Sequence, residues 1–337
     1  MVEKRVLTDV PRIGWGKGIE CTFIGALDAA LRFLGESVDY VYLMGISGAA
    51  FRLLFHQPEW CPSSPDAALN EAYPRQVMKS VGYGGRFFSK EKKSREEMIQ
   101  IIHGEIDKGR PVVAIDLVRH PDWGIITGYK DNVLFCRTYY DKSEEYSVAE
   151  NLPFLIFTFE KVSLPLRRFD AILGSFRLSV DLAYKENIDD YTNGIAAYDA
   201  WIEDLKKDRW FDKMDKDTFK FHWHVNGWTY DSLYDARLAA VRYLQRIETE
   251  FSGKEKETVR KACEKLGQME RMLFENWIYF PMPFWVDMKE KGKTWIPRDR
   301  SIDGNTWTRQ MRRKGADLLK ELKDTEIEVF ELLSRLA

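Results

Sequence analysis

Apolar residues recur at helical spacing in a segment that begins close to Cys21. Four of them would lie on one face of a helix there: Ile24, Leu27, Leu31 and Leu34. Gly35 follows, and glycine readily adopts the left-handed conformation that ends many helices. We therefore expect a helix from about Cys21 to Leu34.

A second helix and several short strands follow in the first half of the chain. Ser94 followed by Glu97 is a capping-box pattern, and Gly109 ends the apolar stripe that comes after it. Beyond Gly109, β-branched and aromatic residues form short runs bounded by turn residues, which indicates strands. We expect these strands at residues 111–118, 123–129, 133–139 and 154–159. Residues 130–132 form a turn, so the two middle strands are expected to pair as a hairpin.

From about residue 168 the apolar spacing becomes helical. A helix is expected to begin near Thr192 or Asn193, and later helices are expected at about 231–251, at about 254–277 and across Leu318 to Leu333. An aromatic stretch at 277–285 separates the last two, and Pro281 prevents a helix from continuing through it.

The change of pattern near Pro165 divides the chain. We expect an α+β first domain with an antiparallel sheet at residues 1–165 and an α-helical bundle at residues 166–337.

Charge and cysteine spacing exclude several classes of partner. The 337 residues include 51 Lys and Arg against 53 Asp and Glu, so no overall positive field draws the chain to nucleic acid or to an anionic membrane. The uncharged apolar stretch at 41–51 is too short to span a bilayer, and the charged first residues do not resemble a secretory signal. Four cysteines without CxxC spacing favour reduced thiols in a cytoplasm.

Cys21 is the candidate nucleophile because its thiol would lie at the start of a helix. Free backbone N–H groups and the helix dipole favour the thiolate there, and the thiolate is the reactive form. The alternative is a small buried cysteine that packs under the helix. Cys61, Cys136 and Cys263 are expected to be loop or core residues.

A cysteine nucleophile needs a base, and His120 lies just before the strand that begins at Trp123. His222 and His224 alternate around Trp223, which would place both on one side of an extended segment. They could bind a metal, but no third ligand is evident, so we assign them a packing role and expect neither metal nor cofactor.

A helix beginning at Cys21, then helices, then Gly109-Arg110-Pro111 leading into Trp123-Gly-Ile-Ile-Thr-Gly-Tyr129, resembles the order of papain-like cysteine peptidase domains. The resemblance is closest to the bacteriocin-processing-peptidase-like branch and to the N-terminal domain of butirosin biosynthesis protein H-like acyltransferases. It covers about the first half of the chain and implies a cysteine nucleophile at the helix start and a histidine base on a strand. It also implies an orienting Asp or Asn on the next strand, for which Asp141 is the candidate. From the residues themselves we expect Asp141 to be a solvated turn aspartate.

Two positions depart from that family pattern. Asp122 stands in the register of the histidine, with His120 two residues earlier, and Trp15 stands in the register of the oxyanion glutamine. In an extended strand His120 and Asp122 would share a face. Losing one oxyanion donor typically costs about 10²–10³ in rate, which argues against ordinary proteolysis. A carboxylate close to the thiol, from Asp122 or Glu20, would also raise the thiol pKa.

Two functions stay open. The first is cysteine-dependent acyl transfer, or amide or thioester cleavage, on a small-molecule, peptide or acyl-carrier-bound substrate, with Cys21 and His120 as the reacting pair. The second is a non-catalytic ligand-binding protein on a papain-like scaffold, in which Trp15, Glu20 and Trp123 contact the ligand. A high aromatic content of 14% suits stacking on flat ligands, although aromatic residues also fill cores. Assembly of identical copies is compatible with either.

Overall fold

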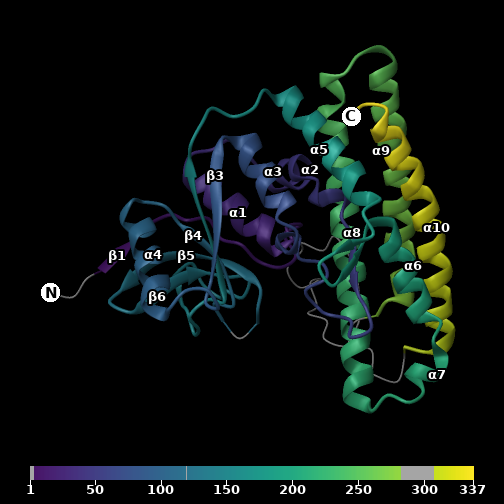
Figure 1. The fold of residues 1–337 in the computed structure, drawn as a ribbon, viewed down its shortest axis with the longest axis horizontal. Helices are drawn as coiled ribbons and strands as arrows, with labels where there is room; N and C mark the ends of the chain where they lie inside the picture. The colour runs from purple at the N-terminus through teal and green to yellow at the C-terminus, as the bar shows by residue number, and fades with distance from the viewer. Residues whose placement is uncertain (1–3, 119, 282–306) are drawn as a thin grey trace. The chain divides into compact units, whose positions relative to one another are not determined.

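The computed structural model describes residues 4–118, 120–281 and 307–337 (Figure 1). It is a mixed α/β protein with an antiparallel sheet and a helical C-terminal region. Internal contacts divide it into two units. Unit 1 is Met1–Leu43 with Pro74–Arg168, and unit 2 is Met44–Tyr73 with Phe169–Ala337. The sequence interpretation kept all of residues 1–165 together, whereas these contacts place residues 44–73 with the helical region.

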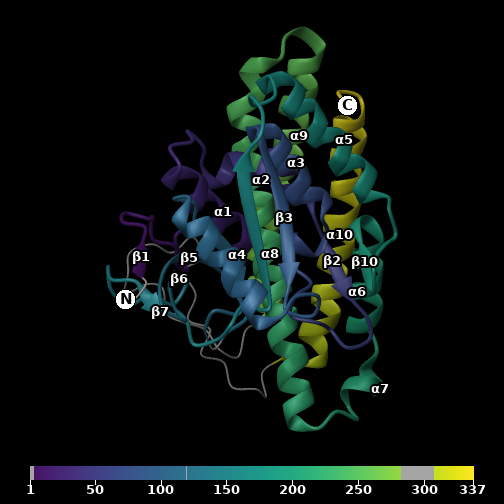
Figure 2. The ribbon, with the colours of Figure 1, turned by 60° about the vertical axis from the view of Figure 1, so that its left-hand side comes forward.

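Unit 1 contains the larger sheet, of which Figure 2 gives a second view, and the strand register shows that each of its strand pairs is antiparallel. Its strands are β1 (Lys4–Val6), β3 (Tyr83–Ser89), β4 (Val112–Ile115), β5 (Trp123–Lys130), β6 (Val133–Arg137), β7 (Ser147–Val148) and β8 (Leu155–Lys161). The order across the sheet is β3-β8-β4-β5-β6-β7, and β1 pairs with β5. The predicted strands are therefore confirmed, with ends shifted by up to three residues.

Strand β5 is the centre of this sheet. Its residues are buried from Trp123 to Tyr129, as expected for a strand covered on both faces. Trp123 meets Phe23 of α1 (Thr22–Phe33) edge to face, and Tyr129 stacks on His103 of α4 (Arg95–Asp107). The hairpin from β5 to β6 is confirmed, with Asp131 in the left-handed region at φ 51°.

Local signals placed α1 and α4 correctly. Cys21 is the N-cap of α1, and Gly35 at φ +86° follows its end. At the start of α4, Ser94 accepts a hydrogen bond from the amide of Glu97, and Glu97 accepts one from the amide of Ser94. The predicted capping box is confirmed.

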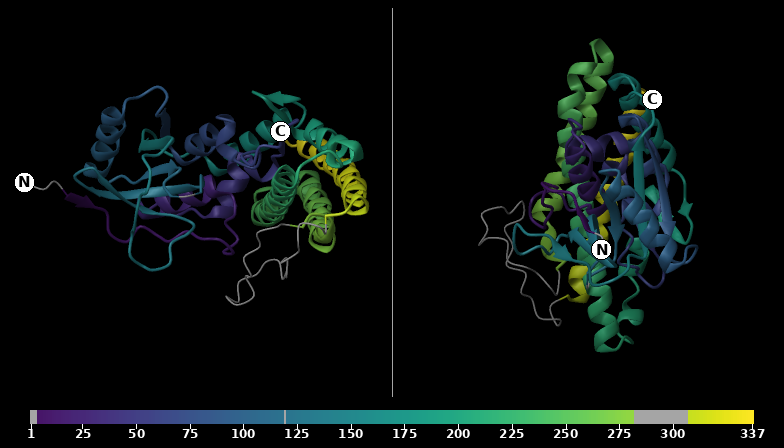
Figure 3. Two further views of the ribbon diagram at one scale, coloured as in Figure 1. Left: turned by 90° about the horizontal axis from the view of Figure 1, so that it is seen from below. Right: turned by 90° about the vertical axis from the view of Figure 1, so that its left-hand side faces the viewer.

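Unit 2 consists mainly of helices, and the left panel of Figure 3 views the long ones nearly end-on. The α-helices of this region are α5 (Arg168–Ala183), α6 (Gly194–Leu205), α7 (Asp208–Phe211), α8 (Lys216–Ile247), α9 (Gly253–Glu275) and α10 (Arg309–Ser334). Short 3₁₀ helices occur at η1 (Ala49–Phe51), η2 (Ala67–Leu69), η3 (Glu248–Glu250) and η4 (Trp277–Tyr279). Helices α2 (Tyr40–Ser47) and α3 (Ala72–Val81) contain the residues at which the chain passes from one unit to the other.

One helix of unit 2 was interpreted wrongly. The extended segment expected around His222 and His224 is the first part of α8, which begins at Lys216 rather than near residue 231. Asp215 caps it by accepting hydrogen bonds from the amides of Asp217 and Thr218. Residues on all sides of α8 are buried, so the sequence carries no single apolar stripe there.

The other expected helices of unit 2 are confirmed. Helix α6 begins after Asn193, α9 covers the expected 254–277 segment to within two residues, and α10 contains the stretch from Leu318 to Leu333. Of the aromatic stretch at 277–285, residues 282–285 lie outside the described residues. None of the described helices is long and apolar enough to cross a membrane.

Residues 44–73 belong to unit 2 because they form strand pairs and hydrogen bonds with its other segments. Strand β2 (Leu54–His56) pairs with β10 (Tyr191–Asn193), which also pairs with β9 (Asn187–Ile188). The buried guanidinium of Arg237 on α8 donates to the carbonyl oxygens of Ala50 and Arg52, at 3.0 and 3.1 Å. Long-range pairing of this kind leaves no local trace in the sequence.

Candidate functional site

Cys21 lies where the sequence predicted it, at the N-terminal end of α1. Its backbone is extended at φ −75° and ψ 97°, and the residue is 5% exposed. Its carbonyl accepts the first helical hydrogen bond, from the amide of Gly25 at 2.9 Å, and its amide donates to the hydroxyl of Tyr40 at 2.9 Å. The side chain therefore starts next to first-turn N–H groups that have no acceptor within the helix.

The glycine-rich loop before Cys21 is folded back on Glu20. Gly16 and Gly18 both have φ of +70°, a conformation that glycine adopts without strain. The Glu20 carboxylate accepts the Gly16 amide at 2.9 Å and is buried. The structure thus assigns Glu20 a loop-holding contact in addition to its candidate role as a ligand contact.

Tyr139 and Tyr140 connect the remaining candidate residues, and the sequence interpretation gave neither tyrosine a role in the site. Tyr139 donates its hydroxyl to the carbonyl of Ile19 at 2.6 Å, two residues before Cys21. The Trp15 ring lies 4.6 Å from the Tyr139 ring and 6.2 Å from the Tyr140 ring, measured between centroids. Trp15 therefore lies among aromatic rings beside the start of α1.

On the other side of Tyr140 are Asp122 and His120. The Tyr140 hydroxyl donates to Asp122 at 2.5 Å, and the exposed His120 ring lies 5.0 Å from the Tyr140 ring. The structure thus brings Asp122, His120, Tyr140 and Trp15 into one continuous set of contacts. The contacts of His120 reach the start of α1 by way of Tyr140, Trp15 and Tyr139.

The extended backbone expected across His120 and Asp122 is wrong. The Asp122 amide donates to the His120 carbonyl at 2.8 Å, which closes a three-residue turn centred on Pro121. Proline favours this turn because its ring fixes φ near −65°. Strand β5 begins only at Trp123.

The surroundings of the Asp122 carboxyl and the Tyr140 hydroxyl shift the pKa of both groups. Partial burial raises the pKa of Asp122, while the Tyr140 hydrogen bond and the nearby His120 charge oppose the rise. Burial of the Tyr140 hydroxyl raises the pKa of Tyr140, although the residue as a whole is 38% exposed, and the Asp122 charge raises it further. The shared proton therefore belongs to Tyr140, and the carboxyl of Asp122 is easier to protonate than an ordinary aspartate.

Trp123 packs in the core of unit 1, and Asp141 is held by buried polar contacts. Trp123 is buried between Phe23 and Phe87, with ring centroids 5.0 and 6.3 Å away. The solvated side chain expected for Asp141 is wrong, because that side chain is 0% exposed and ion-paired with Arg137 at 3.4 Å. One Asp141 oxygen accepts hydrogen bonds from the amide and hydroxyl of Thr138 and from the Ser147 hydroxyl.

The other cysteines provide an internal contrast to Cys21. Burial in β6 raises the pKa of Cys136 to about 12, and burial also raises the pKa of Cys263 on α9. All four cysteines lie in the described part of the chain and are thiols. Among the described residues, no group of three or more His, Cys, Asp or Glu side chains is arranged to hold a metal ion.

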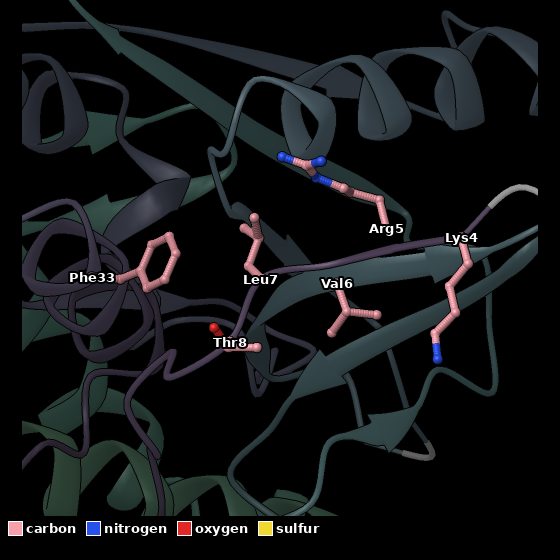
Figure 4. A pocket seen from close by; sticks show the side chains of 6 residues that line it. All are labelled: Lys4, Arg5, Val6, Leu7, Thr8 and Phe33. Atoms are coloured by element: carbon pink, nitrogen blue, oxygen red, sulfur yellow. The ribbon is translucent and has the colours of Figure 1, made fainter.

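A separate hollow of about 440 Å³ lies along β1 (Figure 4). It is lined by Lys4, Arg5, Val6, Leu7, Thr8 and Phe33. Each of these residues is outside the set of sequence-predicted site residues, so this hollow does not add to the group around Cys21.

Comparison with known proteins adds no assignment. No known protein family matches the chain, and no curated protein matches it.

A test of the Asp122 environment follows from the direction of its pKa. A carboxyl whose folded pKa is raised stabilises the fold below its unfolded pKa, and this contribution is lost as the pH rises through the folded pKa. Asp122→Asn keeps an acceptor for Tyr140 but cannot ionise. We expect the variant to gain free energy of unfolding relative to the wild type at pH 7, with the gain shrinking toward pH 4.

Urea denaturation at several pH values measures this difference. Asp107→Asn is the matched control, because Asp107 also accepts a tyrosine hydroxyl, from Tyr129 at 2.8 Å, but is exposed. The control should show the smaller pH-dependent change. A loss of stability in Asp122→Asn that persists at pH 7 would contradict the raised pKa.

Proposed function

We propose that this protein catalyses cysteine-dependent acyl transfer, or amide or thioester cleavage, with Cys21 as the nucleophile. The first unit would then be a papain-like domain acting on a small-molecule, peptide or acyl-carrier-bound substrate. The observation that carries the proposal is the position of Cys21 at the N-cap of the twelve-residue helix α1. The positive end of the helix dipole favours the thiolate at that position.

The reaction would proceed in two steps, acylation of Cys21 and transfer of the acyl group to an acceptor. The Cys21 thiolate attacks the acyl carbonyl carbon, a C–S bond forms, and the bond from that carbon to the leaving group breaks. The leaving group takes a proton from the His120 imidazolium. An acceptor amine or alcohol, or water, then attacks the thioester, gives a proton back to His120, and releases the Cys21 thiolate.

The charge that develops on the substrate oxygen needs hydrogen-bond donors. First-turn N–H groups of α1 would supply them, because these groups have no acceptor within the helix. Trp15 stands where the similar families have a glutamine, and its ring is packed on Tyr139. A site without that amide donor suits an activated thioester better than a peptide bond, so the proposal favours acyl transfer over proteolysis.

Thiol labelling tests the nucleophile directly. We would treat the folded protein with iodoacetamide from pH 5 to 9, measure intact mass, and map the labelled peptides. Below pH 7, Cys21 should react faster than Cys61, because the N-terminal end of α1 stabilises the reactive thiolate. Cys136 should stay unlabelled, in line with its raised pKa.

Two variants complete the experiment. His120→Ala should slow the labelling of Cys21 below pH 7 and leave Cys61 unchanged, and Cys21→Ser should remove the fast phase. With an activated thioester, the wild type should give a burst of one acyl group on Cys21. A free-thiol pH profile for Cys21, together with no acyl adduct from any donor, would count decisively against this function.

A second candidate is ligand binding without catalysis, and one observation favours it. Trp15, Tyr140 and His120 form a row of ring contacts, and Tyr140 and His120 are exposed. Exposed rings of this kind can stack on a flat ligand. Native mass spectrometry of the purified protein decides this question, because a bound small molecule combined with slow Cys21 labelling would favour binding.

A further inference from the structure

Two tyrosine hydroxyls hold the backbone on either side of Glu20, the residue before Cys21. Tyr139, from the segment after β6, donates to the Ile19 carbonyl at 2.6 Å. Tyr40, the first residue of α2, accepts the Cys21 amide at 2.9 Å. Both tyrosines are 4% exposed, so water competes little for these bonds.

Helix α1 is shaped to admit one of these hydroxyls. Gly25 donates the first helical hydrogen bond, to the Cys21 carbonyl, and a Cβ atom at Gly25 would lie 2.0 Å from the Tyr139 hydroxyl oxygen. The same Cβ would lie 3.2 Å from the Ile19 carbonyl oxygen. A glycine inside a helix costs about 0.5–1 kcal/mol relative to alanine, and here it makes room for the Tyr139 contact.

The segment that carries Tyr139 is itself firmly held. Arg137 and Asp141 flank it and pair with each other, and Asp141 accepts the Thr138 amide at 3.1 Å. The buried Arg137 guanidinium also donates to the carbonyl oxygens of Glu144 and Glu145, at 2.7 and 2.9 Å. Tyr139 therefore extends from a fixed loop, and its hydroxyl can hold the Ile19 peptide in one place.

We propose that Tyr139 and Tyr40 are positioning residues for Cys21. By fixing the Ile19 carbonyl and the Cys21 amide, they keep the thiol at the end of α1, where first-turn N–H groups stabilise the thiolate. The inference rests on the proposed function for its chemical consequence, which is a reactive thiol. The holding of the backbone can be measured separately.

The test removes single hydroxyl groups. Tyr139→Phe and Tyr40→Phe each lose one hydrogen bond to the residues around Cys21 and keep the ring. Tyr129→Phe is the matched control, because Tyr129 is buried in the same unit and its hydroxyl donates to Asp107 at 2.8 Å. The pH dependence of Cys21 labelling is measured for all three variants, together with hydrogen exchange of the amides of residues 22–25.

Tyr139→Phe should slow Cys21 labelling below pH 7 by about fivefold, the factor that corresponds to one ordinary hydrogen bond, and should move the pH profile upward. Tyr40→Phe should act in the same direction. Exchange of amides 22–25 should rise in both variants. Tyr129→Phe should lose comparable stability and leave the profile and these amides unchanged.

The outcomes separate the two proposals. A reactive wild-type Cys21 whose profile is the same in Tyr139→Phe and Tyr40→Phe overturns the positioning role and leaves the proposed function standing. A wild-type Cys21 with a free-thiol profile overturns the proposed function. In that case exchange decides the positioning role: faster exchange of amides 22–25 in the two variants supports it, and unchanged exchange overturns it.

Discussion

Arg237→Met is expected to lower the free energy of unfolding by about 3–5 kcal/mol, the usual cost of breaking a buried ion pair from one side. The Arg237 guanidinium is 0% exposed and lies 2.5 Å from the carboxylate of Glu326 on α10. Tyr198 of α6 donates its hydroxyl to the same carboxylate. Without Arg237, the Glu326 carboxyl group would lose its partner cation in a site from which water is excluded.

Urea denaturation of two further variants provides the controls for this result. The double variant Arg237→Met with Glu326→Leu removes both charges and should recover more than half of the loss. Arg260→Met breaks an exposed ion pair with Glu248, at 2.7 Å, and should cost far less, because water and salt screen an exposed pair. If Arg237→Met costs as little as Arg260→Met, the buried pair does not stabilise unit 2 in the way described.

Gly25→Ala is expected to destabilise the protein by about 1–3 kcal/mol, the typical cost of overpacking a well-packed interior. The new Cβ would lie 2.0 Å from the Tyr139 hydroxyl oxygen, so Tyr139 or the first turn of α1 must move. Gly104→Ala, at a helical glycine in α4 with nothing within 4 Å of its Cβ position, is the matched control. That change should stabilise the protein by about 0.5–1 kcal/mol, because alanine is the better helix former.

Combining the two changes tests whether Tyr139 is the cause of the clash. In Gly25→Ala with Tyr139→Phe the closest contact disappears, and the next ring atom lies 3.3 Å from the new Cβ. The double variant should therefore be more stable than Gly25→Ala alone, although Tyr139→Phe by itself removes a hydrogen bond. Simple addition of the two losses, measured by urea denaturation, would contradict this arrangement.

Elements with local signals could be predicted from the sequence. Helix α1 has a one-sided apolar stripe and a terminal glycine, α4 has a complete capping box, and the β5–β6 hairpin has a turn with Asp131 in the left-handed region. The start of α8 could not be predicted in this way. This part of α8 is buried on all sides. The alternation of His222, Trp223 and His224 is a pattern typical of a strand, although the three residues lie in a helix.

The candidate site was only partly predictable, for a related reason. Cys21 could be identified because a helix start is a local feature. Tyr139 acts through the Ile19 carbonyl, which is 120 residues away in the chain, and no short motif records such a contact. The sequence did contain a local signal for the turn at Pro121, because proline disfavours the regular strand that would place His120 and Asp122 on one face.

The assignment of residues 44–73 to unit 2 has a consequence for any cut in the chain. A single break near Arg168 would produce two fragments, and the first would carry a piece of the other unit's interior. Pairing of β2 with β10, and the bonds from Arg237 to the carbonyls of Ala50 and Arg52, would still hold that piece to the second fragment. Severing the backbone at the apparent domain boundary would therefore leave the fragments associated, and neither would carry a complete interior when expressed alone.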